Sequence, residues 1–167
     1  MNCTTEKPIA QEKKGGLEFK VQPHSEEAEI GVIEACFADP PMIDKAREYI
    51  SDEDFYRRGR GRVFGRMVEF SDAGRAFTLS LIEDSFRADE DFWKFRDFLD
   101  ELRPITGQTV SHYSKIVLEM AVRRELITAT EQVLNDLHDL AVPVNDSLTL
   151  LKSAARQAGE RGAVHAS

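Results

Sequence analysis

The chain has 167 residues, of which 41% are hydrophobic and 31% are charged, a balance typical of one globular domain of ordinary size. Its formal net charge of −8, from 22 basic and 30 acidic side chains, opposes non-specific binding to nucleic acid. No apolar run approaches the ~18 residues of a membrane span. The two cysteines, Cys3 and Cys36, are too few for a disulfide framework and lack the spacing of a zinc site.

The first 20 residues differ in composition from the rest. They lack the apolar segment of a secretory signal and include the flexible pair Gly15–Gly16, so we expect a disordered tail and a cytoplasmic protein. Strand-like alternation and hairpin-turn dipeptides are nearly absent from the whole chain. The sequence therefore predicts an all-α protein.

Helical patterns begin at residue 25. Ser25 precedes three closely spaced glutamates and two apolar stripes, which predicts an N-cap and a mostly buried helix that ends before Pro40. A second helix is expected from about Met42. Ser51 and Asp54 then have the spacing of a capping box.

The next helices carry the expected core. A helix over about residues 55–72 should turn Val63, Phe64 and Met67 inward, and Thr78 should cap a short helix after it. These expectations rest on i, i+3, i+4 periodicity, which places the apolar side chains on one helical face.

A long helical hairpin is expected in the second half. Residues 92–102 are rich in aromatic rings, and residues 109–140 follow without an internal proline or glycine. At 1.5 Å per residue the second segment would be on the order of 48 Å long, more than a small bundle covers. We expect these two segments to form the hairpin, and a short, detached, linker-like helix to follow over residues 141–160, with a tail at 161–167.

Motifs of common catalytic sites are missing. The sequence has no Gly-Lys pair for a phosphate-binding loop, no His-Glu-x-x-His and no Gly-x-Ser-x-Gly. The acidic clusters at residues 52–54 and 89–91 fall at expected helix N-termini, where capping accounts for them. We therefore predict no catalytic residue, no cofactor site, no metal site and no enzyme activity of the chain by itself.

An arginine cluster is the first candidate surface. It has two interpretations: a solvated face balanced by nearby carboxylates, or a site for an acidic partner or for phosphates. Three of its members recur every four residues and should face solvent. They are Arg58, Arg62 and Arg66, within a cluster that also holds Arg57 and Arg60.

The long helix over residues 109–140 is the second candidate surface. Its apolar stripe either folds back on the bundle or, as we favour, outlasts the available core and mediates self-association. The expected contact residues are Tyr113, Val117, Met120, Arg124, Ile127 and Leu134.

Three segments resemble the N-terminal collar domain of DnaB-like replicative DNA helicases. The first runs from Pro23 through Ser-Glu-Glu-Ala-Glu into the apolar helix that ends at Asp39. The second joins Asp54-Phe55-Tyr56 to the segment from Arg60 to Phe64, and the third joins Tyr113-Ser114-Lys115-Ile116-Val117 to Arg123-Arg124-Glu125-Leu126-Ile127. The likeness covers about residues 21–140. Two departures are Glu34, in place of a small residue, and Arg60, in place of a histidine.

The resemblance implies a protein–protein interaction and oligomerisation module of DNA replication. Such a domain assembles as a dimer or a ring of dimers and contacts primase, a helicase loader or the helicase ring, with weak or indirect contact to DNA and none to membranes. The segment 145–162 resembles the family's linker helix, and no sequence of the ATPase motor is present. The alternative is a nucleic-acid-binding or regulatory helical protein that uses the Arg57–Arg66 face.

Overall fold

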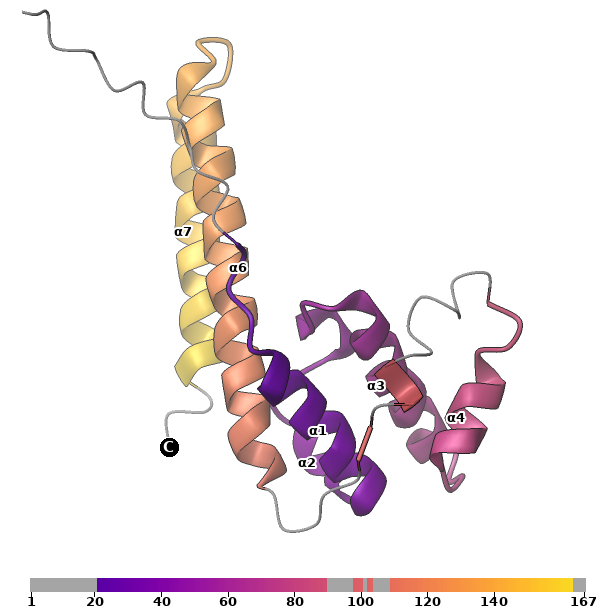
Figure 1. Cartoon of the computed structure of the whole chain (residues 1–167). Coiled ribbons are helices and arrows are strands. Elements are labelled where there is room, and N and C mark those ends of the chain that lie inside the picture. Colours follow the sequence, from indigo (N-terminus) through magenta and orange to yellow (C-terminus); the bar gives the residue numbers. More distant parts are fainter. Residues whose placement is uncertain (1–20, 90–97, 101, 104–108, 164–167) are drawn as a thin grey trace, which may run out of the picture.

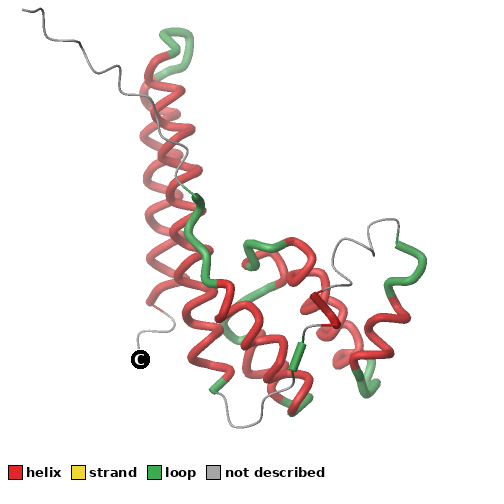
Figure 2. Tube along the Cα trace, in the orientation of Figure 1, coloured by secondary structure: helices red, strands yellow, loops and turns green. Residues whose placement is uncertain are grey.

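The computed structural model describes residues 21–89, 98–100, 102–103 and 109–163, and over these ranges the chain is helix and loop without a strand (Figure 2). A globular body is followed by two long antiparallel helices that project from it (Figure 1). The predicted all-α fold, a compact bundle and then a long hairpin, is confirmed. The elements are α1 (Glu26–Ala38), α2 (Met42–Arg47), the 3-10 turn η1 (Asp52–Asp54), α3 (Arg58–Asp72), α4 (Leu79–Ser85), α6 (Val110–His138) and α7 (Val144–Ala163).

Local capping signals set the ends of α1. The Ser25 hydroxyl accepts a hydrogen bond from the Ala28 N–H at 3.3 Å, which satisfies one of the unpaired donors of the first turn. The helix ends at Ala38 because Asp39 precedes a proline. Between Ala28 and Cys36 every side chain except that of Ile30 is buried, so α1 is the central helix of the body, as predicted.

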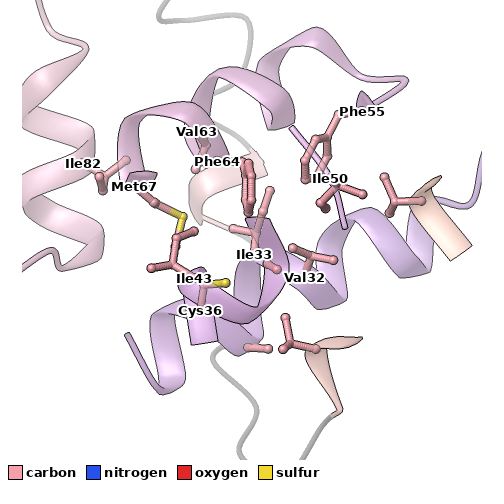
Figure 3. Packing of buried hydrophobic residues seen from close by; sticks show 14 of the residues in the cluster. Val32, Ile33, Cys36, Ile43, Ile50, Phe55, Val63, Phe64, Met67 and Ile82 are labelled. Carbon is pink, nitrogen blue, oxygen red and sulfur yellow. The ribbon is translucent and has the colours of Figure 1, made fainter. Parts of the chain in front are cut away.

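The core lies where α1, α2 and α3 meet. Figure 3 shows Val63, Phe64 and Met67 of α3 turned toward this centre, and each is at most 1% exposed. The Phe55 and Phe64 rings pack with centroids 5.3 Å apart. The inward phase predicted for α3 is confirmed, although the helix starts at Arg58 because residues 52–54 form the separate turn η1.

Gly61 permits a close approach between the backbones of α3 and η1. A Cβ atom at this position would lie 2.2 Å from the Asp52 carbonyl oxygen, well inside van der Waals contact. Backbone atoms of η1 cannot give way as a flexible side chain can. Gly61 therefore lets α3 pack directly on η1.

We expect Gly61→Ala to lower the free energy of unfolding by about 1–3 kcal/mol, the usual cost of overpacking. Urea unfolding measures this loss of stability. Gly159→Ala is the matched control, because nothing lies within 4 Å of a Cβ there and alanine favours a helix over glycine by up to ~1 kcal/mol. Equal stability of the two variants would show that η1 does not press on α3.

The hairpin is built from different segments than the sequence suggested. The second helix of the hairpin is α7, which pairs with the outer part of α6, whereas the sequence suggested residues 92–102; the first turns of α6 pack on α1 (Figure 1). Residues 92–97 lie outside the described residues, while Leu99 and Leu102 join the hydrophobic core. The chain reverses at Asp139–Pro143, the interruption that was expected to separate a detached helix from the rest.

Small side chains explain why α7 packs on α6. Ser147 is 2% exposed, and Ala154 and Ala158 are half-buried on the same face. Small residues let two helices approach closely. The helix is also longer than expected, since it continues through Ala163, so part of the predicted tail 161–167 is helical. The remaining predicted tail residues and the tail over residues 1–20 lie outside the described residues.

Candidate interaction surfaces

A buried carboxylate joins α1 to the start of α3. Glu29 is 2% exposed and accepts hydrogen bonds from the backbone N–H groups of Tyr56 at 2.7 Å and Arg57 at 3.4 Å. It also accepts one from the Arg60 guanidinium at 3.1 Å. Arg57, the N-cap residue of α3, makes no side-chain capping bond. Glu29 therefore holds the two residues that lead into α3, close to the helix N-terminus, where the helix dipole favours a negative charge.

Arg60 does not belong to the exposed arginine cluster, contrary to the sequence prediction. It is 7% exposed, pairs with both Glu29 and Glu26, and lies 5.3 Å from the centre of the Phe98 ring. The signal was present in the sequence: Glu29 falls in the apolar stripe of α1, and a buried carboxylate needs a cation.

We expect Glu29→Ala to lower the free energy of unfolding by about 1–3 kcal/mol, because it leaves the N–H groups of Tyr56 and Arg57 without their acceptor and removes one of the two carboxylates that pair with Arg60. Thermal or urea unfolding followed by circular dichroism measures the loss. Glu27→Ala, in the same first turn but exposed, is the control and should cost less than ~1 kcal/mol. Similar losses in both variants would contradict a stabilising role for the buried Glu29 contacts.

The remaining arginines of α3 are largely charge-balanced. Arg58 is exposed, while the side chains of Arg62 and Arg66 are each about a third exposed and have carboxylate partners. Both guanidiniums also lie over the Phe86 ring, at 5.4 and 5.1 Å from its centre. The partners are Asp89 for Arg62 and Glu69 for Arg66. This arrangement favours a solvated face over a phosphate-binding one.

Three of the residues predicted for self-association are used inside the chain. A Cβ at Gly31 would lie 2.6 Å from the Tyr113 ring, so that ring packs directly on α1. Val117 is 2% exposed and belongs to the core. The Arg124 guanidinium donates to the backbone carbonyl oxygens of Pro23 at 2.8 Å and of Asp54. These contacts fix α6 on the body.

The other three residues predicted for self-association become more exposed along α6. Met120 and Ile127 are half-buried, and Leu134 is 49% exposed. Sequence reasoning did not assign the apolar side chains of α7 to the self-association surface, because it predicted a detached helix there. The exposed apolar residues of the hairpin are Leu126, Leu134, Leu137, Leu140, Val144, Leu148 and Leu151. We call this set the hairpin leucine surface.

Reactive groups are few in the part of the chain that the structure describes. No group of three or more metal-ligating side chains occurs there, and no helix there is long and apolar enough to cross a membrane. The Cys36 thiol is fully buried. Burial, assisted by the nearby charge of Asp39, raises the pKa of Cys36 to about 12.

A thiol with this pKa stays protonated at pH 8, and burial also blocks reagents. In a Cys3→Ser variant, we expect Cys36 to react with a disulfide reagent only after denaturant is added. Absorbance of the released thiolate follows the reaction. Rapid stoichiometric labelling of the native variant would show that α1 is not the closed centre of the body.

Comparison with known proteins identifies the family. The family model for the DnaB-like helicase N terminal domain matches residues 21–119. Replicative DNA helicase DnaB of Geobacillus stearothermophilus is 31% identical over 121 residues, which cover 70% of this chain and 27% of that protein. The DnaB of Treponema pallidum is 31% identical over 128 residues, with 72% and 29% coverage.

The fold comparison agrees. The N-terminal domain of DnaB helicase from Mycobacterium tuberculosis superimposes with a TM-score of 0.72 at 18% identity, covering 80% of this chain and 99% of that one. The chain spans less than a third of the length of the two curated helicases described above, and the family model that it matches is that of their N-terminal domain alone. The chain therefore belongs to the DnaB-like helicase N-terminal domain family, as the resemblance of its three segments implied.

Proposed function

We propose that this chain acts in DNA replication, in the cytoplasm, as a protein–protein interaction and self-association module without a motor of its own. The observation that carries the proposal is the hairpin leucine surface. Leu134 and Leu137 of α6 and Leu148 and Leu151 of α7 are each 44–51% exposed, on helices that project away from the globular body (Figure 1).

Burial of this surface supplies the driving force. Fully burying a leucine stabilises an assembly by roughly 1.5–3 kcal/mol, and contiguous exposed apolar surfaces mark interaction sites. A second copy presents the same leucines, so two hairpins can pair about a two-fold axis with equivalent contacts on both sides. We propose a dimer as the basic unit, from which a ring of dimers can be built through further contacts.

The partner class follows from the family. The proposed partners are a primase, a helicase loader or a helicase ring, contacted as proteins. The arginines of α3 favour this over direct DNA binding, because Arg62 and Arg66 are already paired with carboxylates of the chain. Binding that falls steeply with salt would instead indicate phosphate contacts.

We expect the wild-type chain to dimerise at micromolar to tens of micromolar concentration and the double variant Leu134→Glu/Leu137→Glu to be monomeric. Two charges on each partner would have to be buried on association, which is unfavourable. Both side chains are about half exposed in the single chain, so the variant should remain folded. Light scattering measures mass and circular dichroism measures helix content.

Leu81→Glu is the control for this experiment. Leu81 is 42% exposed but lies on α4, away from the hairpin, so this variant should dimerise like the wild type. A wild-type chain that stays monomeric at high micromolar concentration would contradict the proposal, as would a double variant that dimerises unchanged. Met120 and Ile127 are less suitable probes, because both are half-buried within the single chain.

A further inference from the structure

Arg161 joins the C-terminal end of α7 to the globular body. The Arg161 guanidinium donates to the Asp54 carboxylate of η1 at 2.6 Å and also pairs with Glu125 of α6. The Asp54 side chain is 5% exposed and that of Arg161 is 31% exposed. Burial alone would lower the pKa of Arg161, but the hydrogen bonds and charges of Asp54 and Glu125 raise it above its ordinary value.

The packing of α7 changes along its length. Its first half carries leucines at positions 148, 150 and 151, whereas the inner face of its second half carries only the small side chains of Ala154 and Ala158 before Arg161. Alanine buries little apolar area, so the hydrophobic attachment to α6 weakens toward the C-terminal end. At that end, the charged contact of Arg161 attaches the helix instead.

Two open hollows border this contact and share Glu53 and Glu125. One, of about 500 Å³, lies along α6 and reaches Leu150. The other, of about 530 Å³, contains Asp54 and Arg161. The second hollow leaves the Arg161 contact open to solvent on one side, so fewer atoms pack around it than around a buried side chain.

The charges around the second hollow favour the contact that Arg161 makes there. The second hollow is lined by the four carboxylates of Glu48, Glu53, Asp54 and Glu125 and by two arginines. The other arginine, Arg47, pairs with Asp44 and Asp72 on the body, so Arg161 is the cation that α7 brings to this acidic corner.

We propose that Arg161 is an electrostatic latch that holds the last turns of α7 against η1 and α6, so that this end of the helix exchanges between a docked and a released state. Asp54 can lose Arg161 without losing its own position. Its carboxylate still accepts a hydrogen bond from the Ser51 N–H at 2.8 Å, and its carbonyl oxygen still accepts one from Arg124.

Hydrogen exchange with mass spectrometry tests the latch in the full chain. In Arg161→Glu the new carboxylate is repelled by Asp54 and Glu125, so we expect amides of residues 155–163 to exchange at least tenfold faster than in the wild type. Amides of residues 144–150 should change less than twofold. Arg156→Glu is the matched control: it has the same charge change on the same helix, but its side chain is 72% exposed and pairs only at 3.9 Å with Glu160.

Charge exchange distinguishes a latch from general loss of stability. Adding Glu125→Arg to Arg161→Glu restores an opposite-charge pair, and Glu125 is 51% exposed, so we expect protection of residues 155–163 to return. The latch is wrong if Arg161→Glu leaves their exchange unchanged, if Arg156→Glu accelerates it equally, or if the exchanged pair gives no recovery. Measurement at two protein concentrations separates these outcomes from self-association.

Discussion

The carboxylate of Glu29 is the constraint on which the globular body depends. Its two oxygens hold the N–H groups of Tyr56 and Arg57, which lead into α3, and the buried Arg60 guanidinium within it, so the start of α3 is tied to α1. That placement brings Gly61 against the Asp52 carbonyl oxygen and turns Phe64 and Met67 into the core (Figure 3). A buried charge tolerates few positions for its partners, and it thereby fixes the register of the two helices.

Asp54 makes the second set of contacts, which connects the globular body to the two helices of the hairpin. Its carboxylate accepts from Ser51, the residue before η1, and from Arg161 of α7, while its carbonyl oxygen accepts from Arg124 of α6. The N-terminal segment meets the same place, where the His24 ring stacks on Tyr56 with centroids 4.2 Å apart. One short turn therefore contacts both helices of the hairpin and adds to the packing of α6 on α1 and α2.

Features encoded by neighbouring residues could be predicted, and long-range pairings could not. The Ser25 cap, the Thr78 cap and the inward face of α3 follow from spacing alone. Helical periodicity shows which side chains of residues 109–140 are apolar, but it does not say whether an earlier or a later segment covers them, so α7 was misplaced. Arg60 was misassigned for the same reason: its partners lie more than thirty residues away. Glu34, a departure from the family pattern, also has a partner far away in the sequence. It accepts a hydrogen bond from the Arg103 N–H at 2.7 Å.

Measuring the distance between two hairpins in solution is the most direct test of whether the chain assembles through the hairpin leucine surface. A spin label on His138→Cys, in a Cys3→Ser background where Cys36 is buried, reports this separation by pulsed dipolar spectroscopy. His138 is exposed near the turn of the hairpin. If two hairpins pair about a two-fold axis, the labels should give one narrow intermolecular distance distribution, which disappears on dilution with unlabelled chain. A signal from isolated spins at concentrations where the chain is associated would place the contact elsewhere and contradict assembly through the hairpin.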